Sequence, residues 1–191
     1  MMVFVFSFGC MLSQSSVNAS GYASGGKMHH SKTCQTQNGL PMKTVLILNG
    51  PNLNLLGQRE PLVYGSQSLA DVEQLCERAC AANGLALDFR QSNHEGELVD
   101  WIQAAGKAQS EGTLAGVILN AAAYTHTSVA LLDAIKGTGV TLIELHISNV
   151  HAREAFRHHS FISPVARAVM AGFGVNGYAL AIAGLAQMAH A

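Results

Sequence analysis

The stretch TVLILNGPNLNLLGQREPLVYG, residues 44–65, decides the fold class of this chain. It opens with a short, continuous run of apolar and β-branched residues at 44–49, which is typical of a strand buried on both faces of a sheet. The polar, glycine-containing residues that follow lie beyond the carboxyl end of that predicted strand. A buried strand that runs into such a loop indicates an α/β sheet with a ligand site at its edge.

Strand and helix patterns alternate through the rest of the chain. Ser68 is a good N-cap for one helix, and Gly84 and Gly137 are predicted to end two of them. Short connections between the elements predict a doubly wound, five-stranded parallel sheet covered on both faces. The further strands are expected at 85–91, 114–120, 140–147 and 168–173, and the helices at 69–83, from near Leu98 to Ser110, at 127–136 and at 178–188.

The composition excludes several classes of protein. The chain has 191 residues, and 11 Lys and Arg against 12 Asp and Glu give a formal net charge of −1. Without a basic excess, we expect no nucleic-acid binding through phosphate contacts. Apolar types make up 49% and charged types 12%, which excludes a disordered chain and indicates that part of the surface is buried in an oligomer.

The first 42 residues differ in character from the rest. The apolar start MMVFVFSFGCML is preceded by no Lys or Arg, so the basic region of a signal peptide is missing. Residues 13–39 are rich in Ser, Gly and Gln without periodicity, as in a linker. We expect a disordered N-terminal extension over 1–42 and one catalytic α/β domain over 43–191. A natural start at Met42 is the preferred explanation, and an unusual targeting segment is the alternative.

Residues 168–189 carry no charge and are long enough to cross a membrane. Four glycines and Asn176 interrupt them, so a strand, a glycine turn and a helix fit better, and we expect no membrane association. Cysteine usage favours a reducing, cytoplasmic compartment, because no CxxC pair occurs. Cys76 and Cys80, four apart in a helical pattern, are expected to fill the core.

Polar residues gather after each predicted strand. Because the carboxyl ends of parallel strands meet at one edge of a sheet, they predict a single small-molecule pocket. No G-x-S-x-G elbow or P-loop is present, and Gly172-x-Gly174 stands after the last strand rather than the first, which argues against a nucleotide fingerprint. The histidines between 146 and 159 lack the spacing of a metal site, so proton chemistry on an anionic substrate is favoured.

Four motifs in order decide among these chemistries. Residues 44–65, QSNHEGELVDWIQ, ILNAAAYTHTSVALLDA and IELHISNVHAREAFRHHS resemble type II 3-dehydroquinate dehydratase, from about Met42 to the end of the chain. The resemblance implies a flavodoxin-like sheet and a homododecamer built from trimers. It also implies dehydration of 3-dehydroquinate to 3-dehydroshikimate in the shikimate pathway, without metal or cofactor.

The resemblance also implies a role for each site residue. Tyr64 is expected to take the proton next to the ketone, with Arg59 on the same loop favouring its phenolate and Arg153 assisting. Asn52 is expected to hold a water or polar group near the enolate oxygen, and His146, oriented by Glu144, to protonate the leaving hydroxyl. The residues expected to bind substrate hydroxyls and carboxylate are Asn120, His126, Ile147, Ser148 and Arg157, with Asp133 near a trimer contact.

One departure from the family pattern concerns the loop after residues 114–120. Ala121-Ala122 stands where the family more often has Pro-Gly, so the backbone angles of this loop need to be established. Two alternative functions remain open on the residues alone. One is a flavodoxin-like binding module without catalysis, and the other is a structural oligomer whose polar loops form interfaces.

Overall fold

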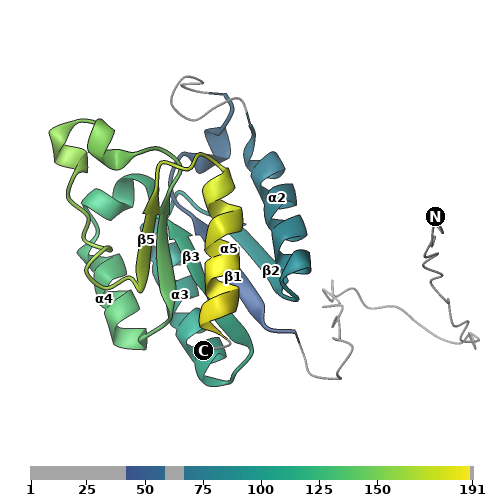
Figure 1. Cartoon of the computed structure of the whole chain (residues 1–191). Coiled ribbons are helices and arrows are strands. Elements are labelled where there is room, and N and C mark those ends of the chain that lie inside the picture. Colours follow the sequence, from purple (N-terminus) through teal and green to yellow (C-terminus); the bar gives the residue numbers. More distant parts are fainter. Residues whose placement is uncertain (1–41, 59–66, 190–191) are drawn as a thin grey trace, which may run out of the picture. The chain divides into compact units, whose positions relative to one another are not determined.

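The computed structural model of the chain describes residues 42–58 and 67–189. Within them, five parallel strands form one sheet in the order β2-β1-β3-β4-β5 (Figure 1). This order and the parallel pairing confirm the predicted doubly wound, flavodoxin-like fold. The strands are β1 Thr44–Asn49, β2 Ala86–Gln91, β3 Leu114–Asn120, β4 Leu142–His146 and β5 Ala168–Ala171.

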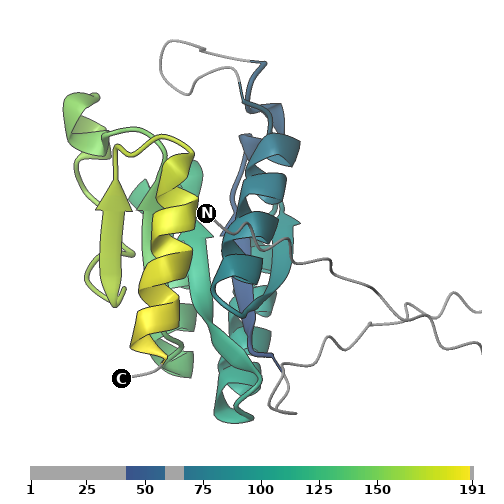
Figure 2. The ribbon, with the colours of Figure 1, turned by 45° about the vertical axis from the view of Figure 1, so that its right-hand side comes forward.

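Helices cover both faces of the sheet (Figures 1 and 2). Helices α2, Leu69–Ala82, and α5, Asn176–Met188, pack against each other on one face. Helices α3, Glu95–Ser110, and α4, Val129–Thr138, pack together on the other. The chain order reverses between β1 and β3, which is where open α/β sheets bind their ligands.

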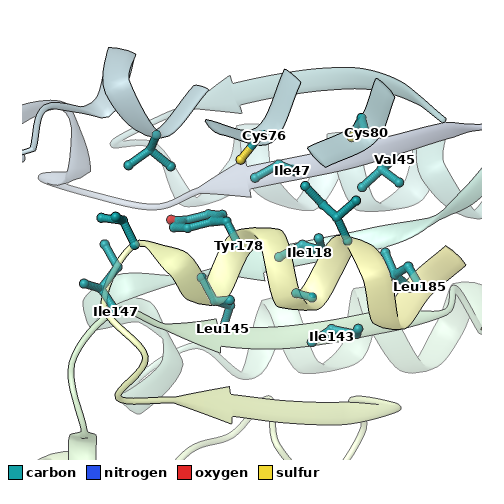
Figure 3. Close-up of a cluster of buried hydrophobic side chains, with 14 of the residues drawn as sticks. Val45, Ile47, Cys76, Cys80, Ile118, Ile143, Leu145, Ile147, Tyr178 and Leu185 are labelled. Atoms are coloured by element: carbon teal, nitrogen blue, oxygen red, sulfur yellow. The ribbon is translucent and has the colours of Figure 1, made fainter. Parts of the chain in front are cut away.

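Alternating residues of the central strands supply the two halves of the core. In β1, Val45 and Ile47 face α2 and α5, whereas Leu46 and Leu48 face α3 and α4. This burial of successive residues explains why the strand reads as an uninterrupted apolar run. Figure 3 shows the first half, in which Cys76 and Cys80 are 0% and 1% exposed, as predicted for core-filling thiols.

The ends of several elements differ from the prediction. Helix α4 runs through Gly137 and stops at Gly139, whose φ of 63° allows the left-handed C-cap that closes the helix. It begins after Ser128, whose side chain accepts a hydrogen bond from the Leu131 N–H. The fourth and fifth strands are shorter than predicted. Pairing of β4 with β3 begins at Leu142, and pairing of β4 with β5 ends at His146 and Ala171.

The predicted N-terminal extension lies outside the described residues except for Met42. Over residues 42–58 and 67–189, no helix combines the length and apolar character that crossing a membrane requires. The uncharged stretch from 168 to 189 forms β5, a glycine-containing turn and α5, which is the arrangement that its glycines predicted.

Candidate active site

A pocket of about 280 Å³ opens at the carboxyl edge of the sheet, where β1, β3 and β4 end. Glu144 lies behind it, and Asp133 is exposed on α4 and does not line it. Arg59 and Tyr64, the predicted proton-abstracting pair, lie outside the described residues. The predicted site residues that the fold brings together in its wall are Asn52, Asn120, His126, His146, Ile147, Ser148, Arg153 and Arg157.

His146 and Glu144 form a buried pair at the end of β4. Alternate residues of a strand point to the same face, so both side chains leave β4 on one side. His146 Nε2 lies 2.9 Å from Glu144 Oε1, and the residues are 7% and 0% exposed. Since a carboxylate can only accept a hydrogen bond, Nε2 carries the ring proton and Nδ1 is left to exchange a proton with a bound molecule.

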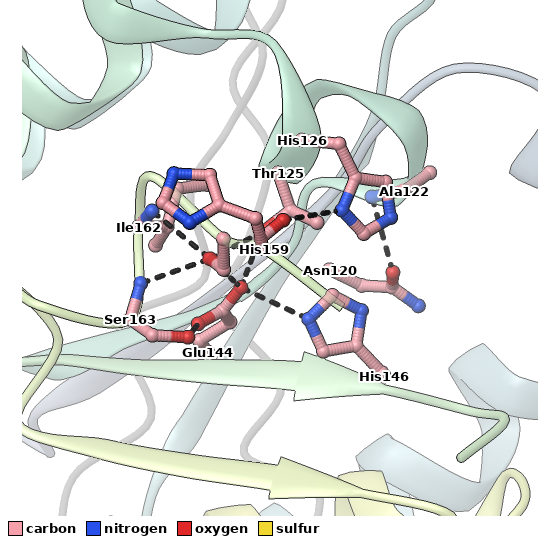
Figure 4. A network of polar contacts seen from close by, with 10 residues as sticks. Asn120, Ala122, Thr125, His126, Glu144, His146, His159, Ile162 and Ser163 are labelled. Carbon is pink, nitrogen blue, oxygen red and sulfur yellow. Dashed lines mark hydrogen bonds and ion pairs between the residues drawn. The ribbon is translucent and has the colours of Figure 1, made fainter. Parts of the chain in front are cut away.

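Three hydroxyl groups surround the Glu144 carboxylate (Figure 4). Thr125 and Ser160 donate to Oε1, the latter at 2.7 Å, and Ser163 donates to Oε2. Burial by itself raises the pKa of Glu144, but hydrogen bonds from His146 and these hydroxyls outweigh it and lower the pKa from 4.5 to about 2. The carboxylate is therefore ionised at neutral pH and holds the imidazole in one orientation.

The sequence motifs contained Thr125 and Ser160 but not Ser163, and nothing in the sequence assigned a role to any of the three. Thr125 lies 19 residues from Glu144, and Ser160 and Ser163 lie 16 and 19 residues away on the other side. The loop after β3 and the loop before β5 meet only in the folded chain, so their spacing carries no local signal. The one usable hint was a buried acid at the end of a strand, which needs donors from elsewhere.

His126, on the short 3-10 helix η2 (Ala122–His126), faces the pocket with a fixed ring. Its Nδ1 lies 2.7 Å from the His159 main-chain oxygen (Figure 4). A carbonyl oxygen only accepts, so Nδ1 carries the proton and Nε2 of the neutral ring is an acceptor. His126 can thus accept a hydrogen bond from a hydroxyl group of a ligand.

The loops after β1, β2 and β3 are locked together beside the pocket. The Asn52 N–H donates to Asn93 Oδ1 at 2.8 Å, and the Tyr124 hydroxyl donates to the Asn93 carbonyl oxygen at 2.8 Å. A Cβ atom at Gly50 would lie 2.5 Å from the Ala121 carbonyl oxygen, so this close approach requires glycine. Asn52 itself has φ 66°, a left-handed conformation that asparagine tolerates well.

The Ala121-Ala122 departure has a measurable consequence. Ala122 has φ 50°, a left-handed conformation in which a Cβ atom is disfavoured, and it lines the pocket next to Asn120. Its N–H donates to Asn120 Oδ1 at 3.3 Å. The loop therefore keeps the turn that a glycine would adopt without strain, and the alanine methyl group adds to the pocket wall.

Two arginines form the outer wall of the pocket. Arg153 follows the 3-10 helix η3 (Val150–Ala152), and Arg157 ends the next one, η4 (Ala155–Arg157). Both contact the exposed Glu154 carboxylate, with Arg157 Nε 3.0 Å and Arg153 Nε 3.5 Å from Oε2. Their guanidinium groups suit a ligand carboxylate, because Arg can bind such a group through two parallel hydrogen bonds.

The arrangement suits proton transfer on a small anion. Its lining includes a histidine that can give or take a proton and two arginines that can hold a carboxylate. Among the described residues, no three His, Cys, Asp or Glu side chains converge closely enough to hold a metal ion.

Comparisons with known proteins agree with this geometry. The family model described as Dehydroquinase class II matches residues 43–186. A protein of an Acidovorax species named 3-dehydroquinate dehydratase is 77% identical over 145 residues, which cover 76% of this chain and 98% of that protein. One from Ralstonia nicotianae named 3-dehydroquinate dehydratase 2 is 64% identical over 148 residues, covering 78% of this chain and 96% of its own length.

Solved structures lead to the same family. The type II dehydroquinase from Propionibacterium acnes is 39% identical with a TM-score of 0.70, over 76% of this chain and 97% of that one. The type II dehydroquinase from Butyrivibrio crossotus is 39% identical with a TM-score of 0.71, over 75% and 97% of the two chains.

Proposed function

This chain belongs to the class II dehydroquinase family, and we propose that it removes water from 3-dehydroquinate to give 3-dehydroshikimate, a step of the shikimate pathway. The observation that carries the proposal is the buried Glu144–His146 pair beside a pocket that His146, Arg153 and Arg157 line together. That pocket offers an acid for a leaving hydroxyl and cations for the substrate carboxylate. A binding module without catalysis is not favoured, because binding alone needs no histidine fixed by an ionised acid.

The reaction proceeds in two proton transfers. Tyr64, as phenolate, takes the proton on the carbon next to the ketone, and the electron pair of that C–H bond forms an enolate. Arg59 favours the phenolate with Arg153 assisting, while Asn52 holds a water or polar group beside the enolate oxygen, whose charge needs donors. As the enolate collapses, the C–O bond breaks and His146, protonated on both ring nitrogens, gives its Nδ1 proton to the departing hydroxyl, which leaves as water.

The remaining residues bind the substrate. Arg157 is proposed to hold the carboxylate. Hydroxyl groups contact Asn120, His126 and Ser148, together with the Ile147 main chain. No cofactor has a role in this scheme, since the protein supplies both the base and the acid.

The product provides a direct assay, because 3-dehydroshikimate contains a conjugated enone and 3-dehydroquinate does not. Ultraviolet absorbance should therefore rise when the purified protein meets 3-dehydroquinate, and the rise should scale with protein concentration. A protein that binds 3-dehydroquinate by calorimetry without any such rise would be the binding module, and the proposal would fail.

We also propose a homododecamer built from trimers, with Asp133 near a trimer contact. The 12% charge content supports it, as do large apolar side chains that the single chain leaves exposed: Phe156 at 67%, Phe173 at 57% and Val169 at 51%. Sedimentation should give a particle near twelve times the chain mass. A stable, active species at 20.1 kDa would contradict the proposal.

Residues 1–42 are proposed to be a dispensable extension of a cytoplasmic enzyme. The family model begins at residue 43, which supports the first point, and the free, buried thiols of Cys76 and Cys80 suit a reducing compartment. Deleting residues 1–42 should leave turnover and sedimentation unchanged. A truncated protein that is inactive or monomeric would refute the idea.

A further inference from the structure

A second polar network lies beneath the pocket, and Asn120 is its only side chain with a role in the proposed function. Tyr178 on α5 is 0% exposed, and its hydroxyl group lies between two asparagine side chains at the ends of β1 and β3. The hydroxyl donates to Asn49 Oδ1 at 2.6 Å and accepts from Asn120 Nδ2 at 2.9 Å. Asn49 and Asn120 are 0% and 3% exposed, so neither can exchange these partners freely for water.

The two ends of this network are main-chain groups whose hydrogen-bonding roles are fixed. At one end, Asn49 Nδ2 donates to the Arg90 carbonyl oxygen at 3.1 Å, so the oxygen of that amide must face Tyr178. At the other end, Asn120 Oδ1 accepts from the Ala122 N–H at 3.3 Å. A carbonyl only accepts and an N–H only donates, so every bond from Ala122 to Arg90 runs in the same direction.

We propose that Tyr178 and Asn49 form a positioning clamp that allows the Asn120 amide a single orientation toward the substrate. The inference rests on the proposed function, in which Asn120 binds a substrate hydroxyl group. Asn120 is the member of the network that lines the pocket, and Tyr178 and Asn49 act through it.

The orientation matters because the two ends of an amide have the same shape and opposite hydrogen-bonding roles. A reversed Asn120 would place its NH₂ group against the Ala122 N–H and its oxygen against Tyr178. Burial raises the pKa of Tyr178, so the phenol stays protonated and its O–H donates a hydrogen bond to Asn49. With that proton committed, the phenol oxygen can accept only from the NH₂ end of Asn120, and the reversed amide is excluded.

The test is a double-mutant cycle between Tyr178→Phe and Asn120→Ala, with KM and kcat measured by enone absorbance. Tyr178→Phe removes the hydroxyl, so that only the long bond from the Ala122 N–H still opposes reversal of the Asn120 amide. KM for 3-dehydroquinate should therefore rise about tenfold with a smaller change in kcat. In the Asn120→Ala background, adding Tyr178→Phe should change kcat/KM less than about twofold, because the group it positions is absent.

Ile182→Val is the matched control, since Ile182 is also 0% exposed on α5 and belongs to the same half of the core. It should leave KM and kcat near wild-type values. If the loss of kcat/KM in the double variant equals the product of the losses in Tyr178→Phe and Asn120→Ala, the clamp is overturned. An unchanged KM in Tyr178→Phe would overturn it as well.

A second variant covers the case in which Tyr178→Phe does not fold. Asn49→Ala lies outside the pocket and leaves the Tyr178 hydroxyl free to turn toward Asn120, so it should raise KM in the same way and again have no effect when Asn120 is alanine. The clamp is again overturned if the loss of kcat/KM in the double variant equals the product of the Asn49→Ala and Asn120→Ala losses. Failure of the wild type to produce enone would instead overturn the proposed function and this inference with it.

Discussion

The inner and outer walls of the pocket are held in opposite ways. On the inner wall, His146 is 7% exposed. Glu144 behind it is 0% exposed, and its carboxylate accepts hydrogen bonds from His146 and three hydroxyl groups. On the outer wall, the Arg157 and Glu154 side chains are 29% and 54% exposed, and their contact is an ion pair open to solvent. The acid is therefore fixed before substrate arrives, whereas the arginine can exchange its partner for a substrate carboxylate.

The largest effect should come from removing the acid itself. His146→Ala should lower kcat by about 10²- to 10⁴-fold, the usual contribution of a general acid, with a smaller change in KM. His151→Ala is the control, because His151 is exposed on η3 and does not line the pocket. Near-normal turnover of His146→Ala in the enone assay would place the acid elsewhere.

The buried Glu144 carboxylate should also make the free energy of unfolding depend on pH. The pKa of Glu144 is about 2 in the folded protein against an ordinary 4.5, so its stabilising contribution is present above pH 4.5 and is lost as pH falls toward 2. That difference corresponds to roughly 3 kcal/mol.

Glu144→Gln should remove this part of the acid dependence of the unfolding free energy and lower kcat. Denaturant unfolding of both proteins between pH 7 and pH 2 measures it. Parallel curves would mean that the pKa of Glu144 is the same in the folded and the unfolded protein, and this comparison of the two walls would lose its basis.

The outer wall should respond in binding rather than in chemistry. Arg157→Ala should raise KM about 10- to 100-fold, because a charged hydrogen-bonding partner of the carboxylate is lost, while kcat changes less. Glu154→Gln removes the negative charge from the same ion pair and should leave KM within about twofold of wild type. If both variants raise KM equally, the ion pair positions the arginine and is not simply replaced by substrate.

The smallest effect concerns the strained turn at Ala122, which also lines the pocket. Ala122→Gly should stabilise the fold by about 1 kcal/mol, since glycine adopts φ 50° without the Cβ penalty. Ala123→Gly is the matched control and should destabilise by a similar or smaller amount, because its φ is not positive. Thermal unfolding of both variants decides the point, and a destabilised Ala122→Gly would show that the alanine is not strained.

The same contrast explains how much of the protein the sequence could predict. The apolar runs of the strands and the polar residues at their ends are local patterns, and they located the sheet and the edge at which the pocket opens. The individual site residues came from the family resemblance. The partners of Glu144 come from loops brought together by folding, so Thr125, Ser160 and Ser163 gave no local signal. The network through Tyr178 joins residues up to 129 positions apart, which no spacing rule covers.

Local backbone angles were the other feature that the sequence could not predict. Gly137 and Gly139 are equally plausible ends for α4 in the sequence, and only the left-handed φ of 63° at Gly139 separates them. The left-handed φ at Ala122 could not be predicted either, because alanine is a poor residue for that conformation and its presence argues locally for another turn.

The most direct test of the central claim is ultraviolet absorbance after mixing 3-dehydroquinate with wild type, Tyr64→Phe and Tyr124→Phe. The account predicts enone formation by the wild type, a loss of about 10²- to 10⁴-fold in kcat for Tyr64→Phe, and most of the activity retained by Tyr124→Phe. Near-normal kcat for Tyr64→Phe would contradict its role as the base, and a wild type that forms no enone would contradict the account as a whole.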